Sequence, residues 1–113
     1  MRIVLVAFAS AFVLVIPACG GSSPTSDCNS IASTYCNKYF QCSQTAADQE
    51  YGNESACETK IEQSFGCATW ACPTNETYNG SEVDSCISAY NSLSCGDITM
   101  TPSQCQNLAP ACN

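Results

Sequence analysis

The residues of this chain with the most evident chemistry are its cysteines, which number eleven in 113 residues. Thiols at this density form disulfides, bind metals or carry out dithiol redox chemistry. Metal binding and redox chemistry both favour close C-x-x-C pairs, and zinc sites often add histidine. The shortest gap here, from Cys67 to Cys72, has four intervening residues, and the chain has no histidine. The spacing therefore predicts structural disulfides, with no metal site and no cofactor.

An odd number of cysteines leaves one thiol over in an exported protein. If Cys19 is set aside, ten remain for five disulfides: Cys28, Cys36, Cys42, Cys57, Cys67, Cys72, Cys86, Cys95, Cys105 and Cys112. Each disulfide adds about 2–4 kcal/mol. Large aliphatic residues are scarce after the first 18 residues, so we expect disulfides to supply stability that a small core cannot. They also require an oxidising compartment, such as a periplasm, a cell surface or the extracellular space.

The first 18 residues have the composition of an export signal. Arg2 supplies a positive start, residues 3–16 are almost all apolar, and small residues precede Cys19. This order is typical of a secretory signal peptide. The alternative, a transmembrane anchor, needs about 20 apolar residues, whereas this run has 14. We therefore predict a signal peptide over residues 1–18.

The segment Ile16-Pro17-Ala18-Cys19 resembles the lipobox of bacterial lipoproteins. In that family the cysteine thiol receives a diacylglyceryl group, and the peptide bond before it is then cleaved. Ala18 fits the small position and Cys19 the obligatory one, whereas Pro17 departs from the residues usual at its position. The resemblance implies a lipid on Cys19 that attaches the protein to a membrane. The alternative is ordinary cleavage after Ala18, which would leave Cys19 as one more half-cystine.

The residues after Cys19 suggest how the rest of the chain is organised. Gly20 resembles the pattern of lipoproteins sent to the outer membrane. Residues 19–26 are the expected lipidated cysteine and a flexible Gly/Ser tether. Residues 27–113 are then expected to form one disulfide-stapled domain.

Helical periodicity is the main signal within this domain. Three segments place apolar residues three and four positions apart and carry N-cap residues such as Asp27 and Ser81: Asp27–Gln41, Asn53–Phe65 and Glu82–Ser94. A short fourth helix is predicted over Pro102–Leu108, after a T-x-x-Q capping box. Convincing period-2 alternation is absent. The sequence predicts an all-α fold, a small disulfide-rich bundle of three to four short helices.

The cysteines bracket the three main predicted helices as the pairs 28/36, 57/67 and 86/95. This is either a decayed Cys–helix–Cys repeat or the need to pin both ends of a short helix, and we favour pinning. Antiparallel packing of neighbouring helices weakly favours the disulfides Cys42–Cys57 and Cys95–Cys105. The loop from Thr69 to Gly80 has no helical signal. Its Trp70 either covers a thin core, which we favour, or forms part of a contact surface.

The formal net charge is −7, and Lys38 and Lys60 are the only basic residues after Arg2. This argues against nucleic acid and against anionic headgroups as partners. Glu54, Glu58 and Glu62 would line one helix face, which is either simply solvated or a weak cation-attracting strip. The absence of histidine removes the usual general base. A paired-carboxylate hydrolase would need a cleft that so small a domain can hardly build. We therefore expect no enzymatic activity.

As a whole, the chain is similar to small cysteine-rich lipoproteins of unknown function that some Gram-negative bacteria make. The cysteines at 28, 36, 42, 57, 67, 86, 95 and 105 carry that similarity, which brings no activity with it. It implies a non-enzymatic, membrane-anchored module of the cell envelope that binds a protein or glycan partner or has a structural role. The alternative is a freely secreted disulfide-rich effector or inhibitor, and a more distant one is a degraded enzyme.

Overall fold

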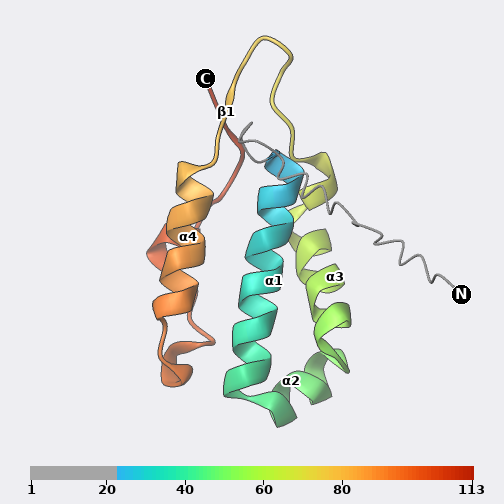
Figure 1. The fold of residues 1–113 in the computed structure, drawn as a ribbon. Helices are drawn as coiled ribbons and strands as arrows, with labels where there is room; N and C mark the ends of the chain where they lie inside the picture. The colour runs from blue at the N-terminus through green and yellow to red at the C-terminus, as the bar shows by residue number, and fades with distance from the viewer. Residues whose placement is uncertain (1–22) are drawn as a thin grey trace, which may run out of the picture.

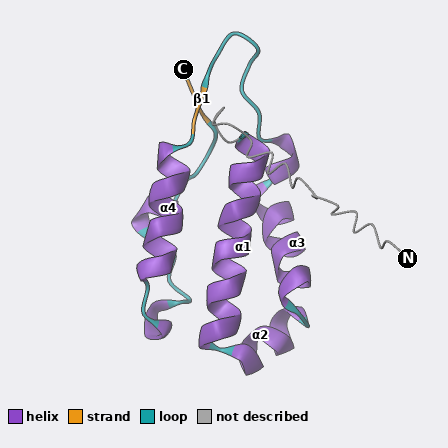
Figure 2. Cartoon of the chain, viewed as in Figure 1, coloured by secondary structure: helices purple, strands orange, loops and turns teal. Residues whose placement is uncertain are grey.

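The structure is a computed structural model that describes residues 23–113. The predicted signal peptide and Cys19 therefore lie outside the described residues. The described part has four α-helices, three 3-10 turns and two short strands (Figure 2). The helices are α1 (Pro24–Cys42), α2 (Gln44–Tyr51), α3 (Glu54–Phe65) and α4 (Ser81–Ser92). The other elements are η1 (Cys67–Thr69), β1 (Tyr78–Asn79), η2 (Cys95–Asp97), η3 (Ser103–Cys105) and β2 (Ala111–Cys112). The all-α prediction is confirmed.

The long helix α1 lies between α3 and α4, so the three helices stand side by side (Figure 1). The short helix α2 links the C-terminal end of α1 to the start of α3. After α4 the chain returns in the opposite direction, and β2 pairs with β1 in antiparallel register, Tyr78 opposite Cys112 and Asn79 opposite Ala111. This strand pair lies at the end of the molecule where α1 begins (Figure 1).

The start of α1 differs from the prediction. Pro24 occupies the first turn, and the side chain of Ser23 accepts a hydrogen bond from the Ser26 backbone N–H at 3.1 Å. Serine at the N-cap followed by proline is a strong start signal, because proline lacks the N–H that would be unsatisfied there. Asp27 is therefore in the first turn instead of being the cap. Residues 24–26, which were assigned to the tether, belong to the helix.

The other helix boundaries were partly predicted. Asn53 caps α3 through the Ala56 N–H, and Gly66, with a φ of +66°, ends it after Phe65, the last residue of the predicted range. Helix α4 begins at Ser81, which was expected to be its N-cap, and the Asn79 side chain accepts the Ser81 N–H at 3.0 Å. Helix α2 was missed, because Ala47 is its one buried residue and so little apolar periodicity can be detected.

The structure contains a short strand pair that the sequence did not indicate, and the prediction of a fourth helix over Pro102–Leu108 was wrong. In that segment the structure has only the 3-10 turn η3. Asn107 adopts a left-handed φ of +56°, which does not continue a helix. Cys105 is bonded to Cys86 of α4, which holds this turn against the helix. Strands β1 and β2 have two residues each, too few for alternation to be visible in a sequence.

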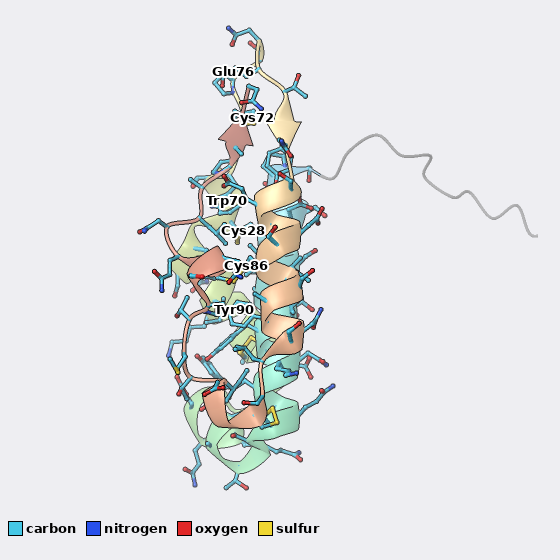
Figure 3. All side chains as sticks on the ribbon, turned by 90° about the vertical axis from the view of Figure 1, so that its left-hand side faces the viewer. Cys28, Trp70, Cys72, Glu76, Cys86 and Tyr90 are labelled. Carbon is cyan, nitrogen blue, oxygen red and sulfur yellow. A yellow bond between two sulfur atoms is a disulfide. The ribbon has the colours of Figure 1, made fainter. Side chains whose placement is uncertain are left out.

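The core is a narrow column between the helices. Its main cluster combines Ile31, Trp70, Val83 and Tyr90 with four half-cystines, all at most 7 % exposed. Figure 3 shows Trp70, Cys28, Cys86 and Tyr90 following one another along the long axis. A second, smaller cluster joins Tyr39, Ala47 and Ile98 near α2. Half of the buried residues in the main cluster are disulfide-bonded cysteines, as expected of a domain too small for a large apolar core.

Candidate functional site

All ten cysteines of residues 23–113 form disulfides. The bonds are Cys28–Cys67, Cys36–Cys57, Cys42–Cys95, Cys72–Cys112 and Cys86–Cys105. The weakly favoured pairs Cys42–Cys57 and Cys95–Cys105 were wrong. Cys28 and Cys36 are eight residues apart on α1 and so share the face toward α3. Cys42 follows Cys36 by six residues, which is about 240° around the helix, and it therefore points elsewhere.

The five bonds have a nested order that the sequence did not reveal. Cys28–Cys67 encloses Cys36–Cys57 in the first half of the chain, and Cys72–Cys112 encloses Cys86–Cys105 in the second half. Cys42–Cys95 is the one disulfide of the described residues that joins the two halves. Helix α3 and its following turn are fixed to α1 at two points, as pinning of helix ends predicts for that helix. Cys36 and Cys86 lie inside α1 and α4, so the pairs 28/36 and 86/95 do not mark the ends of those helices.

Exposure distinguishes the five bonds. Both partners are buried in Cys28–Cys67, Cys36–Cys57 and Cys86–Cys105, with at most 3 % exposure. Cys95 is exposed and Cys42 half-buried, whereas Cys72 and Cys112 are both half-buried. Because thiol–disulfide exchange requires the attacking thiolate to reach a sulfur atom, the bond between the two halves is the most accessible.

We therefore expect limiting dithiothreitol, without denaturant, to reduce Cys42–Cys95 first. Cys72–Cys112 should follow, and the three buried bonds should react only after denaturation. Alkylation of the released thiols followed by peptide mapping measures this order. Early labelling of Cys28 or Cys57 would contradict it.

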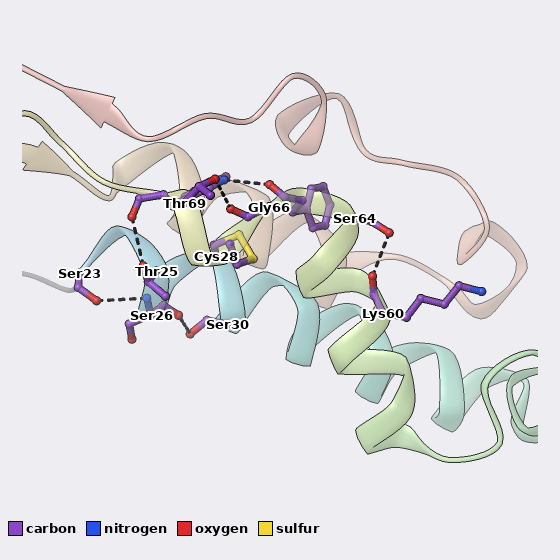
Figure 4. The surroundings of a disulfide bond; sticks show 12 residues. Ser23, Thr25, Ser26, Cys28, Ser30, Lys60, Ser64, Gly66 and Thr69 are labelled. Atoms are coloured by element: carbon purple, nitrogen blue, oxygen red, sulfur yellow. Dashed lines mark hydrogen bonds between the residues drawn. A yellow bond between two sulfur atoms is a disulfide. The ribbon is translucent and has the colours of Figure 1, made fainter.

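The beginning of α1 is bonded to residues far away in the sequence. The Tyr78 hydroxyl donates to the carboxylate of buried Asp27 at 2.8 Å. The Thr25 hydroxyl donates to the Trp70 carbonyl at 3.1 Å (Figure 4). Burial raises the pKa of Tyr78 well above its usual value, and the bond to Asp27 raises it further. Asp27 thus holds β1 against α1 instead of capping the helix.

Trp70 covers the core, which confirms the interpretation we favoured. It is 7 % exposed, and its indole N–H donates to the Phe65 carbonyl at 3.1 Å. Beyond it, residues 71–77 form a protruding segment, which we call the tip loop. Its residues are exposed apart from half-buried Cys72. Figures 1 and 3 show this loop at the end of the molecule opposite α2, with Glu76 near its extremity.

The tip loop is held at both sides. A turn closes it through the Glu76 N–H, which donates to the Pro73 carbonyl at 3.0 Å. Thr77 and Asn113 exchange two backbone hydrogen bonds, of 2.7 and 2.9 Å, and Cys72 is bonded to Cys112. The loop is thus a stapled projection, and its uncharged polar residues are free to contact another molecule.

A group of tyrosines lies where α1 and α4 pack together. Tyr35 stacks on Tyr39 and meets Tyr90 edge-on, with ring centroids 5.8 and 5.6 Å apart. The Tyr39 hydroxyl donates to Glu50 at 3.0 Å. A cavity of about 200 Å³ opens beside Tyr35 and Tyr90, under exposed Met100. This volume is below the usual range of small-molecule sites, so the group serves mainly as core.

The acidic row of α3 does not form a metal site. Glu54 accepts a hydrogen bond from the Asn37 amide at 3.3 Å, whereas Glu58 and Glu62 line a broad polar hollow of about 500 Å³ with serines of α1. Residues 23–113 contain no group of three or more His, Cys, Asp or Glu side chains that could hold a metal ion. Glu58 and Glu62 thus border a hydroxyl-rich surface, and no cation ligand set is visible within that range.

None of the helices within residues 23–113 is both long and apolar enough to cross a bilayer. The chain gives no match to protein-family models, to curated proteins or to solved structures.

Proposed function

We propose that the protein is a non-enzymatic lipoprotein of the bacterial cell envelope, attached to the outer membrane through a lipid on Cys19. The observation that carries this proposal is the use of cysteines. Eleven are present in the sequence, and ten are paired with one another inside the domain. Cys19 thus has no partner available among the ten cysteines of residues 23–113. An exported protein with one leftover thiol, set in a lipobox-like sequence, fits acylation of that thiol.

The surface of the domain supports a binding or structural role. Two of its hollows are lined chiefly by polar side chains, among which serine is the most frequent, and the chain has no histidine to act as a general base. The tip loop is the best-defined projection, with a disulfide and a backbone ladder at its base. Loops held by a rigid scaffold are common contact surfaces for proteins and glycans.

A freely secreted effector or inhibitor is the second candidate, and the same stapled loop is the observation that favours it. Small secreted domains are often disulfide-dense. The two candidates differ at one atom, the sulfur of Cys19. A thioether to a diacylglyceryl group would attach the protein to a membrane, whereas a free or intermolecularly paired thiol would indicate release.

Intact-mass measurement of the protein from the membrane fraction, without reduction and with free thiols blocked, tests the proposal. We expect residues 19–113 plus acyl groups, less two hydrogens for each of the five disulfides. No thiol should take the label. The variant Cys19→Ser should lose the acyl mass and leave the membrane, and Gly21→Ala should retain both.

Recovery of unacylated protein from the medium, with Cys19 labelled or joined to a second molecule, would overturn the proposal. The secreted effector would then be the better explanation. Recovery of Cys19→Ser in the membrane fraction at the native level would likewise contradict an anchor on that residue.

A further inference from the structure

We infer that the tip loop, residues 71–77, faces the bilayer and contacts its headgroup layer, while α2 and η2 form the outward end. This inference rests on attachment through Cys19, as proposed above. It adds to that proposal the orientation of the domain relative to the bilayer and the lipid surface that its tip loop contacts. Three features support it: the place where the loop is fixed, the reach of the anchor, and the charges of the loop.

The loop is fixed to the part of the chain nearest the anchor. Trp70 and Tyr78 flank the loop, and both are bonded to the first turn of α1, through Thr25 and Asp27. The disulfide Cys28–Cys67 lies next to this turn along α1 (Figure 4). The start of α1 and the base of the loop therefore behave as one unit.

The anchor can place this unit only close to the membrane. Ser23 is four residues after Cys19, and a fully extended chain of four residues spans at most about 14 Å. The tip loop projects beyond the first turn of α1 (Figure 1). By contrast, α2 follows the far end of α1, whose 19 residues extend over about 28 Å. The loop is thus the first part of the domain to meet the membrane.

The charges at this end define the kind of surface that fits. The tip loop has one charged residue, Glu76, and its other exposed side chains are alanine, proline, threonine and asparagine. Both lysines of the described part lie elsewhere, Lys38 at the Asn91 carbonyl and Lys60 over the Tyr51 ring. Basic residues supply attraction to anionic lipids. Their absence from the loop fits zwitterionic headgroups, which its hydroxyl and amide groups can meet through hydrogen bonds.

Paramagnetic relaxation in NMR tests this orientation. Residues 19–113, folded with their five disulfides, are joined by the Cys19 thiol to a maleimide lipid in phosphatidylcholine nanodiscs. A small share of the lipid carries a gadolinium chelate. We expect the amide signals of Thr74, Asn75 and Thr77 to be broadened and those of α2 to be unaffected. Because the attachment is chemical, this result does not depend on whether cells acylate Cys19, which the mass measurement decides.

A lengthened tether is the matched control. Inserting about 20 Gly and Ser residues after Gly21 lets the domain move away from the bilayer. The broadening of the tip loop should then be lost while the protein stays attached. Stronger broadening of α2 than of the loop, equal broadening throughout, or broadening of the loop that survives the longer tether would each overturn the inference.

Lipid charge provides a second measurement. Replacing part of the phosphatidylcholine by phosphatidylglycerol should weaken the broadening of the loop, because Glu76 is repelled by anionic headgroups. Glu76→Gln should restore part of it, because Glu82 and Asp84 also lie near Tyr78 at the base of the loop. If anionic lipid instead strengthens the broadening of the wild-type loop, the assignment of a zwitterionic surface is wrong.

Discussion

Replacing both Cys28 and Cys67 by alanine is expected to lower the free energy of unfolding by about 5 kcal/mol. About 3 kcal/mol of this comes from release of the constraint on the unfolded chain. A further contribution of about 1 kcal/mol for each buried sulfur atom comes from the cavity left in the core. The free energy of unfolding of small domains begins at about 5 kcal/mol, so this variant should be largely unfolded at 37 °C. Guanidinium titration followed by circular dichroism measures the change.

The chain provides a matched control in the bond Cys72–Cys112. The two disulfides span 39 and 40 residues, and each encloses an inner bond of similar span, 21 and 19 residues. Their effects on the unfolded chain should therefore be nearly equal. They differ in burial, since Cys28 and Cys67 lie in the core and Cys72 and Cys112 are half-buried.

The variant Cys72→Ala/Cys112→Ala should thus lose only about 3 kcal/mol, and the difference of about 2 kcal/mol between the two variants measures packing of sulfur in the core. Equal losses would mean that the buried disulfide stabilises the protein only through the unfolded chain. A larger loss for Cys72→Ala/Cys112→Ala would contradict the deeper burial of Cys28 and Cys67 in the core.

The parts of the fold that were predictable from sequence are those that local interactions determine. Helix α3 shows this, because Asn53 and Gly66 act on neighbouring backbone groups and so mark its ends directly. The start of α1 was missed by three residues, although Ser23-Pro24 is itself a local signal. Asp27 was the more obvious cap residue, and its role as partner of Tyr78 depends on a contact 51 residues away.

The disulfide pairing could not be predicted in the same way. It depends on which side of α1 each cysteine occupies and on which element then packs against that side. Cys42 lies at the last turn of α1, next in sequence to α2, yet its partner Cys95 follows α4. Likewise, the contact between Thr77 and Asn113 forms only after the second half has folded back on itself. The candidate site at the tip loop therefore became apparent only in three dimensions.

Raising the pH above 10 is expected to unfold the protein cooperatively. Burial raises the pKa values of Tyr35, Tyr39, Tyr51, Tyr78 and Tyr90. In the unfolded chain these phenols ionise with a pKa of about 10. Above that pH the unfolded state binds fewer protons than the folded state, so the free energy of unfolding decreases as the pH rises. Each phenol that stays protonated only in the folded state contributes a slope of about 1.4 kcal/mol per pH unit.

Phenolate absorbance and circular dichroism, recorded together against pH, measure this transition. Both signals should change at the same pH, and return to pH 7 should restore the fold if the disulfides are intact by mass. Gradual ionisation of all five phenols near pH 10 without loss of helix would contradict the burial that raises their pKa values.

The variant Tyr78→Phe tests the contribution of one of the five phenols to this transition. It removes one ionisable group, so the alkaline slope should become shallower. It also removes a hydrogen-bond donor from Asp27, so stability at pH 7 should fall by about 1–3 kcal/mol, the usual cost of a lost bond to a buried charged group. We expect a variant that is less stable at pH 7 and whose stability falls less steeply with pH above 10. This result would show that the hydrogen bond to Asp27 stabilises the base of the tip loop and also opposes ionisation of the Tyr78 phenol. That combination follows from the geometry, because the proton that Tyr78 retains at high pH is the one it donates to Asp27.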